Sequence, residues 1–290
     1  MKFDPPVGGM KYISGLIGVL LGLFVLSGDG VAEDAKMQFS GVVLVQGDNP
    51  VLRDFTRWLS RKADYTMVPA YADSYQSVSE SLKEHGNDLA WTCGAPFAHD
   101  HVTDGQLLVA VPLFQGKPVY HSLTITRSGR QEEKITDFAG QVLAYSDPRS
   151  NSGFVVPAYV LQEQGVDISR HFRLLLHTGM HEGSIRAVLE GLADVANVDE
   201  YVYVEYLKSH PLAKDKLKVV QRFGPYPFTP IVAGNRMPPD VLKRLQQALV
   251  GMAADKRGSE ILGRLGLDGF VVKDASFYDP IVRMLSALHQ

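Results

Sequence analysis

Three consecutive polar residues, Ser150, Asn151 and Ser152, have side chains suited to holding an anion. They follow the apolar segment 141–144, which predicts a short buried strand, and they precede 155–164, which predicts a helix. A loop in this setting directs the free backbone N–H groups of a helix start, together with two hydroxyls, at one point. The same side chains could instead only cap the helix. The pattern therefore predicts either an oxyanion site or an ordinary helix cap.

A second group of candidates lies further along the chain. His181 precedes the predicted helix 184–190, and a histidine near a helix N-terminus is disfavoured as a cation unless an anion is bound beside it. Asp199 follows the predicted strand 194–197, where it could accept a hydrogen bond from a protonated ligand or cap the next helix. A binding role and a capping or packing role stay open for both residues.

The chain has a single cysteine, Cys93, which lies just after the predicted strand 88–91. One cysteine excludes an intrachain disulfide and a multi-cysteine metal site. At a buried strand end it is either a small apolar side chain or a soft ligand, for example for arsenic(III). His99 and His101 fall on a predicted polar loop without a third spaced ligand, so we predict no metal site and no cofactor. Motifs of known enzyme classes are absent from the sequence, so we predict no enzyme.

Alternating strands and helices must position these residues, which favours an α/β fold with largely parallel sheets. A helix–strand pattern at 77–90 recurs at 184–196 and predicts two similar lobes. Two extended segments, 119–126 and 219–230, would cross between the lobes as a hinge. The predicted strands are 39–46, 66–69, 88–91, 109–114, 119–126, 141–144, 194–197 and 231–233, and the predicted helices are 51–62, 77–84, 155–164, 184–190, 200–207, 241–254, 259–265 and 278–288.

Lobe 1 is predicted to comprise 37–119 and 231–290, capped by the C-terminal helices, and lobe 2 to comprise 120–230. Ligand groups of such a fold lie at the carboxyl ends of strands and in the loops that follow. Asp48, Asn49 and Thr178 are polar candidates there. The residues predicted to bind the ligand are Tyr75, Trp91, Thr92, Cys93, Tyr120, Ser122, Ser150, Asn151, Ser152, His181, Asn197, Asp199 and Tyr201.

The N-terminal segment and the composition indicate where the protein acts. Residues 1–32 have a charged start, an apolar stretch and small residues before Glu33, which predicts a cleavable signal peptide and export to a periplasm; the start could be Met1 or Met10. The 290 residues carry a formal net charge of −3, which gives no indication of a nucleic-acid partner. We expect a soluble, monomeric mature protein.

Three stretches, 88–97, 147–157 and 178–199, make the chain resemble the phosphonate-type periplasmic solute-binding proteins of ABC transporters, which have the two-lobed type II fold. Ser150 and Ser152 match the family's Ser-Thr-Ser helix start, and Asn151 stands in place of its threonine. The resemblance implies pocket tyrosines at Tyr75 and Tyr120. It also implies that His181 is the family's histidine and Asp199 its acidic residue.

The resemblance implies capture of a small phosphorus oxyanion or organophosphonate for an ABC permease. Two other hypotheses stay open. In one, the protein is a sensor subunit for a histidine kinase and reads arsenite or another oxyanion through Cys93. In the other, it carries an apolar molecule such as a sterol or lipid for a lipid exporter, which the aromatic, proline-rich segment 224–230 would suit.

Overall fold

The computed structural model describes residues 34–41 and 49–288. The predictions made for the signal peptide 1–32, for the choice of start and for Asp48 lie outside these residues. Within the described ranges, no helix is both long and apolar enough to cross a membrane.

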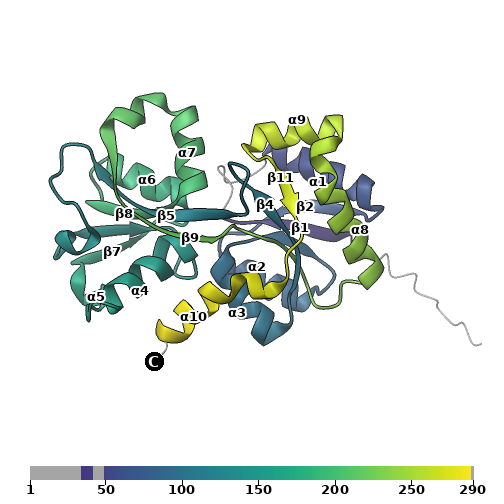
Figure 1. Cartoon of the computed structure of the whole chain (residues 1–290), viewed down its shortest axis with the longest axis horizontal. Helices are drawn as coiled ribbons and strands as arrows, with labels where there is room; N and C mark the ends of the chain where they lie inside the picture. Colours follow the sequence, from purple (N-terminus) through teal and green to yellow (C-terminus); the bar gives the residue numbers. More distant parts are fainter. Residues whose placement is uncertain (1–33, 42–48, 289–290) are drawn as a thin grey trace, which may run out of the picture. The chain divides into compact units, whose positions relative to one another are not determined.

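Six strands form the first sheet, in the order β11-β4-β10-β3-β1-β2 (Figure 1). Strand β1 pairs in parallel with β2 and β3, whereas β10 is antiparallel to β3 and β4, and β11 is antiparallel to β4. The carboxyl ends of β1 and β3 therefore meet at one edge. The strands are β1 (Ala35–Phe39), β2 (Met67–Tyr71), β3 (Leu89–Trp91), β4 (Leu107–Leu113), β10 (Ile231–Ala233) and β11 (Gly269–Val271).

Amphipathic helices pack on this sheet because each has one apolar stripe. In α1, Leu52, Phe55 and Leu59 are fully buried, and the Asn49 side chain caps the helix by accepting from the N–H of Val51. The helices are α1 (Pro50–Ala63), α2 (Tyr75–Glu84), α3 (Gly94–Asp104), α8 (Pro239–Val250) and α9 (Lys256–Leu265), with short 3₁₀ turns at Met252–Ala254 and Ala275–Tyr278. We call the first sheet with these helices the first half.

Five strands form the second sheet, in the order β7-β6-β8-β5-β9. Strand β6 is parallel to β7 and β8, and β5 is antiparallel to β8 and β9. The strands are β5 (Val119–Arg127), β6 (Val142–Tyr145), β7 (Leu174–His177), β8 (Val195–Asp199) and β9 (Leu217–Pro227). The helices are α4 (Val156–Gln162), α5 (Ile168–His171), α6 (His181–Leu189) and α7 (Glu200–Ser209), with 3₁₀ turns at Ile135–Phe138 and Pro211–Lys216. These elements form the second half.

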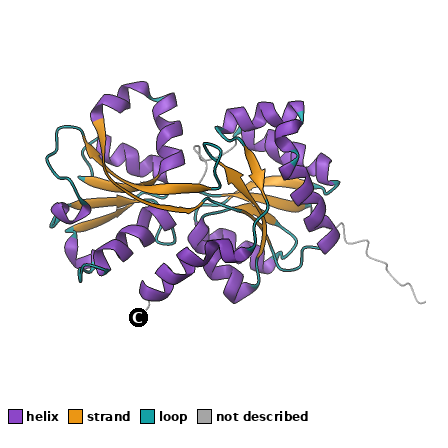
Figure 2. Ribbon diagram, in the orientation of Figure 1, coloured by secondary structure: helices purple, strands orange, loops and turns teal. Residues whose placement is uncertain are grey.

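The chain passes from the first sheet to the second between β4 and β5 and returns between β9 and β10. Figure 2 shows the two long strands β5 and β9 side by side, and their pairing runs from Val119 with Pro227 to Arg127 with Leu217. The two predicted crossings are thus one antiparallel pair. The exact lobe boundaries, 37–119 with 231–290 and 120–230, stay predictions.

Several sequence predictions are wrong in detail. The strand predicted at 39–46 begins earlier, since β1 covers Ala35–Phe39, and positions 42–46 of the prediction lie outside the described residues. Its alternation of apolar and polar residues is a strand pattern, which the prediction passed over for the continuous apolar run that follows. The polar loop predicted around His99 and His101 is helix α3. Its glycine, proline and histidines suggest a loop, but proline is tolerated in a first helical turn. Strands β7 and β11 were not predicted.

The last helix, α10 (Asp279–Leu288), was predicted to cap lobe 1 alone, and it contacts both halves. It packs against α3 of the first half and against α4 of the second half. The side-chain amide of Gln162 in α4 donates to the backbone oxygen of Ala287 at 3.0 Å. The amphipathic pattern of α10 predicts a buried face but does not say which half covers it.

Candidate functional site

The polar turn at 150–152 follows the carboxyl end of β6 and opens a single π-helical turn, Asn151–Val155, that leads into α4. The Ser150 hydroxyl accepts from the N–H of Gly153 at 3.1 Å, so the predicted capping role is confirmed. The side chains of the turn are completely buried. A π-turn inside helical structure is uncommon and occurs frequently at functional sites. The turn is therefore both a cap and a buried polar surface.

Cys93 of the first half and Tyr120 of the crossing strand both contact this turn directly. The backbone N–H of Asn151 donates to Sγ of Cys93 at 3.3 Å, and its side-chain amide donates to the Tyr120 hydroxyl at 3.0 Å. Cys93 precedes the first residue of α3, whereas Tyr120 lies on the crossing strand β5. Burial raises the pKa of the Cys93 thiol to about 11, so this sulfur is protonated at neutral pH.

Two further candidates support the turn from the second sheet. The Ser122 hydroxyl donates to the backbone oxygen of Ser152 at 2.8 Å. The Asn197 amide nitrogen in turn donates to Ser122 at 3.3 Å and to Thr124 at 3.2 Å. Strands β5 and β8 pair here, with Ser122 opposite Asp199, so this polar chain follows from the register of the sheet. Ser122 and Asn197 fix the position of the turn.

His181 lies at the first position of α6 and faces the same turn. Its Nε2 is 3.3 Å from the Ser150 hydroxyl and 3.5 Å from that of Ser146. Its Nδ1 accepts the backbone N–H of Asp199 at 3.3 Å, so the neutral ring carries its proton on Nε2. Burial lowers the pKa of His181 to about 3. The imidazole is therefore a neutral donor directed at the serines.

Asp199 is the N-cap of α7. One of its oxygens accepts from the N–H groups of Tyr201 at 2.7 Å and Val202 at 3.4 Å, which confirms the predicted cap. Burial raises the pKa of Asp199 to about 7, against the lowering effect of these two hydrogen bonds. Near neutral pH this carboxyl can hold a proton, which removes the charge that would repel an anion.

Four buried polar atoms of the predicted residues lack a hydrogen-bond partner among the described residues. They belong to residues of both halves: the Tyr75 hydroxyl, Oγ1 of Thr92, Oδ1 of Asn151 and Oγ of Ser152. Burial and the neighbouring Cys93 and Asp147 raise the pKa of Tyr75, which keeps its phenol a donor. Buried polar groups in proteins are almost always paired, because an unpaired one costs about 1–3 kcal/mol. These atoms are the free donors and acceptors of the site.

Two predicted residues lie apart from this cluster. The Trp91 indole donates to Oγ1 of Thr229 at 3.2 Å, and its ring packs against Phe55 and Phe270 in the hydrophobic core of the first half. The Tyr201 hydroxyl donates to the backbone oxygen of Leu265 at 2.7 Å, at the end of α9.

The other polar candidates have local roles. Asn49 caps α1. The Thr178 hydroxyl bonds the backbone of Tyr145 and the hydroxyl of Ser184 beside the start of α6.

Three residues next to the turn escaped the prediction although they directly precede it. Ser146 contacts His181, and Asp147 accepts the backbone N–H of Tyr75 at 3.3 Å across the boundary between the halves. Arg149 forms a charged cluster with α2 and α3. Polar residues that directly follow a strand end were a usable signal, since such positions carry ligand contacts in α/β sheets.

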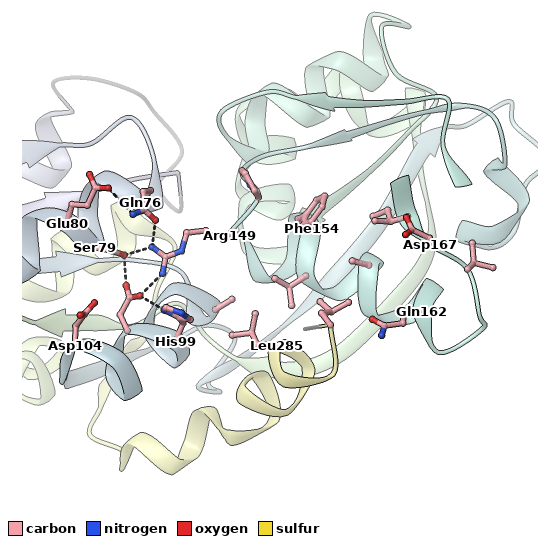
Figure 3. A pocket seen from close by; sticks show the side chains of 18 of the residues that line it. Gln76, Ser79, Glu80, His99, Asp104, Arg149, Phe154, Gln162, Asp167 and Leu285 are labelled. Atoms are coloured by element: carbon pink, nitrogen blue, oxygen red, sulfur yellow. Dashed lines mark hydrogen bonds and ion pairs between the residues drawn. The ribbon is translucent and has the colours of Figure 1, made fainter. Parts of the chain in front are cut away.

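A groove of about 1140 Å³ opens beside the turn (Figure 3). Residues of α2 and α3 form one wall, with Arg149 next to them, whereas Phe154, Gln162 and Asp167 of the second half lie opposite, and Leu285 of α10 borders it. None of the residues predicted to bind the ligand lines this groove. In the described ranges no three His, Cys, Asp or Glu side chains gather as a metal site would need.

Comparison with known proteins adds to this geometry. Residues 49–278 match the family model described as "ABC transporter, phosphonate, periplasmic substrate-binding protein". The chain is 24% identical over 223 residues to the phosphonates-binding periplasmic protein of Escherichia coli, which covers 75% of this chain. It is 28% identical over 212 residues to the phosphate-import protein PhnD of Mycolicibacterium smegmatis, which covers 68% of this chain. Each match spans 64% of the relative's own length.

Solved structures share the fold. A binding-protein component of an ABC phosphonate transporter from Pseudomonas aeruginosa superposes with a TM-score of 0.77 at 20% identity, covering 89% of this chain and 87% of that one. PhnD1 of Prochlorococcus marinus, in complex with methylphosphonate, gives 0.76 at 18% identity, covering 88% and 98%. The GluR0 ligand-binding core of Nostoc punctiforme gives 0.59 at 17% identity, covering 80% and 98%. The fold is that of the two-lobed type II periplasmic binding proteins, as predicted.

Proposed function

We propose that this chain, which belongs to the family of phosphonate-type periplasmic substrate-binding proteins of ABC transporters, binds a small phosphorus oxyanion or organophosphonate between its two halves. It would act in the periplasm and deliver the ligand to an inner-membrane ABC permease. The export of the chain by the segment 1–32 stays part of this proposal. The role is binding without catalysis.

The observation that carries the proposal is a set of buried polar atoms, on residues of both halves, that have no hydrogen-bond partner within the described part of the chain. Tyr75 and Thr92 belong to the first half, and Asn151 and Ser152 belong to the second. Asn151 and Ser152 lie at the start of the π-turn, and the positive end of a helix dipole favours anions. A ligand that bonds all four atoms would offset their desolvation and would draw the halves together.

The charges of the site favour a ligand that carries its own proton. The residues of the cluster include neutral donors, a neutral His181 and an Asp199 carboxyl whose pKa is raised to about 7. None of the thirteen predicted ligand residues is a lysine or arginine. A singly protonated oxyanion or a singly protonated phosphonate suits this set, because Oδ1 of Asn151 or the Asp199 carboxyl can accept a hydrogen bond from the ligand's O–H.

The other two hypotheses have less support. The Cys93 thiol is protonated and already accepts the N–H of Asn151, which disfavours its use as a soft ligand for arsenite in a sensor. A sterol or lipid carrier needs an apolar cavity, whereas the buried side chains gathered around the turn are largely polar.

Calorimetric titration of the purified protein with phosphite, phosphate, methylphosphonate and aminoethylphosphonate tests the proposal. We expect saturable heat with at least one of them and a rise in melting temperature. Ser152→Ala should weaken the binding, and Ser286→Ala, which removes an exposed hydroxyl on α10, should not. Absence of heat with all four anions would refute the proposed function. Binding of arsenite alone would favour the sensor, and a co-purified lipid would favour the carrier.

A further inference from the structure

Arg149, the residue directly before the polar turn, connects the second half to two helices of the first half (Figure 3). One terminal nitrogen of its guanidinium donates to the Gln76 side chain at 3.0 Å and to the Ser79 hydroxyl at 2.7 Å. The other donates to Asp100 at 2.6 Å. Gln76 and Ser79 lie on α2, and Asp100 lies on α3.

The carboxylate that receives this arginine is deeply buried. The Asp100 side chain is 3% exposed and that of Arg149 is 23% exposed, so water screens the pair far less than an ordinary surface pair. Asp100 also accepts from the Ser79 hydroxyl and from the Gln106 amide, and His99 contacts it at 2.8 Å. These partners belong to the first half and hold the carboxylate in place to receive the guanidinium.

We propose that Arg149 is a positioning residue that clamps the Ser150-Asn151-Ser152 turn against α2 and α3 and thereby sets how often the two halves separate. Arg149 touches none of the four free polar atoms of the site, and it acts through its neighbour Ser150. The effect on ligand binding rests on the proposed function, whereas the effect on separation of the halves does not.

The physical reason is the state of Asp100 when the halves separate. With Arg149 present, separation breaks a charge-assisted, forked set of hydrogen bonds. Without the guanidinium, Asp100 is a buried carboxylate that has lost its cation, and separation would hydrate it. Removing Arg149 therefore favours the separated state, and removing the charge of Asp100 as well should cancel part of this effect.

The chain carries its own probe for this separation. Cys93 is the single cysteine, it is 1% exposed, and its sulfur accepts the N–H of Asn151 across the boundary between the halves. A neutral alkylating reagent such as N-ethylmaleimide should reach the thiol only when the halves part. The rate of labelling, followed by mass spectrometry without any ligand, then reports how often they do.

We expect Arg149→Met to raise the Cys93 labelling rate by about 10- to 100-fold, the range for losing a charge-assisted hydrogen bond. Arg149→Lys should give an intermediate rate, because an ammonium keeps the charge but carries its donors on one nitrogen, whereas the guanidinium reaches α2 and Asp100 from two. In Arg149→Met combined with Asp100→Asn, the rate should be lower than in Arg149→Met alone. The matched control is Arg130→Met, since Arg130 binds Glu132 and Gln141 within the second half at a similar exposure of 26%.

An unchanged labelling rate in Arg149→Met overturns the proposal, and so does an equal rise in Arg130→Met, which would indicate general loosening. In a second arm, the probe anion that binds wild-type protein best should leave Arg149→Met faster, with its association rate within a few-fold. An unchanged dissociation rate would contradict the coupling to binding. If wild-type protein binds none of the four anions, the proposed function fails, and the labelling rates alone decide on the clamp.

Discussion

Arg149 and the turn that follows it are neighbours in the chain, but they use their polar groups in opposite ways. Both terminal nitrogens of Arg149 are occupied by acceptors of the first half. In the turn, by contrast, Oδ1 of Asn151 and Oγ of Ser152 are buried without a partner among the described residues. Satisfied groups stabilise the contact between the halves, whereas unsatisfied groups cost free energy until a ligand pairs with them.

This contrast distinguishes two contributions to binding: direct contacts with the ligand, made by the turn, and the contact between the halves, made by Arg149. Substitutions in the turn should change affinity with small effects on how often the halves separate. Substitutions at Arg149 should change how often the halves separate, and should change affinity only through that separation. The predictions below test the turn side of this division, in order of decreasing effect.

The largest effect is expected from Gly153→Ala, which fills the space behind the turn. An added methyl group would lie 2.6 Å from Oγ of Ser146, 3.0 Å from Oγ of Ser150 and 3.3 Å from Cε1 of His181. Overpacking of a buried site costs about 1–3 kcal/mol of stability. Because it displaces the donors, we expect anion affinity to fall by about 100-fold or more, roughly 3 kcal/mol, in a calorimetric titration.

The matched control for that change is Gly129→Ala, where an added methyl group meets nothing within 4 Å. It should keep both the melting temperature and the affinity of the wild-type protein. If Gly153→Ala bound the anion as tightly as this control, the donors around Ser150 and His181 would not form the site.

The next largest effect on affinity is expected at Ser152. Comparing Ser152 with Ser122 tests whether a buried hydroxyl without a partner serves ligand binding rather than stability. Oγ of Ser152 has no partner among the described residues, so Ser152→Ala should keep or raise the free energy of unfolding, because it removes a buried unpaired hydroxyl, and should weaken anion binding by about 1.5–3 kcal/mol. Ser122→Ala removes a donor to Ser152 and an acceptor of Asn197, so it should lower the unfolding free energy by about 1–3 kcal/mol. Urea denaturation and calorimetry measure both. Equal losses of stability would contradict the distinction.

Much of the fold could be predicted because its signals are local. The apolar segment before 150–152 and the helix pattern after it identify a strand, a loop and a helix whatever the rest of the chain does. Helix α3 escaped because Gly94, Pro96 and two histidines have weak helix propensity, and tertiary packing overrides that preference. Strand β1 alternates apolar Ala35, Met37 and Phe39 with Lys36 and Gln38, which is a strand pattern, and the prediction missed it by following the continuous apolar run after Phe39 instead.

The composition of the candidate site could be predicted less completely, because it depends on which way a side chain turns. Trp91 ends β3 directly before Thr92, and Tyr201 lies two residues after β8, yet their polar atoms bond Thr229 and Leu265. Nothing in their spacing indicates that direction. The role of Arg149 depends on Asp100, 49 residues earlier, and such a long-range pair leaves no periodic trace in one sequence.

A smaller effect on anion binding is expected from pH through Asp199. Burial raises the pKa of its folded-state carboxyl to about 7, above the ordinary 3.8, so the folded protein binds more protons than the unfolded chain between these values. The free energy of unfolding should therefore fall as pH rises through this window, by up to about 1 kcal/mol per pH unit, and level off above it. Anion affinity should fall likewise as pH passes 7, because the carboxylate then repels the ligand.

Asp199→Asn keeps an oxygen that can cap α7 and removes the titrating proton. In this variant the dependence of stability and of affinity on pH between 5 and 8 should flatten. Urea denaturation and titration at several pH values measure it. A wild-type slope that persists in Asp199→Asn would assign the proton to another group.

The smallest effect on binding is expected from Tyr201→Phe, which removes the hydroxyl that donates to Leu265 at 2.7 Å. Both groups are buried, and an unpaired carbonyl is left behind, so the free energy of unfolding should fall by about 1 kcal/mol. Because this hydroxyl already has its partner, the anion affinity should stay within a factor of about two, roughly 0.4 kcal/mol. A tenfold loss of affinity without loss of stability would instead place Tyr201 in the site. It would also show that a paired hydroxyl can exchange its partner for the ligand. Whether a group is paired in this structure would then no longer distinguish residues that hold the halves together, such as Arg149, from residues that bind the ligand.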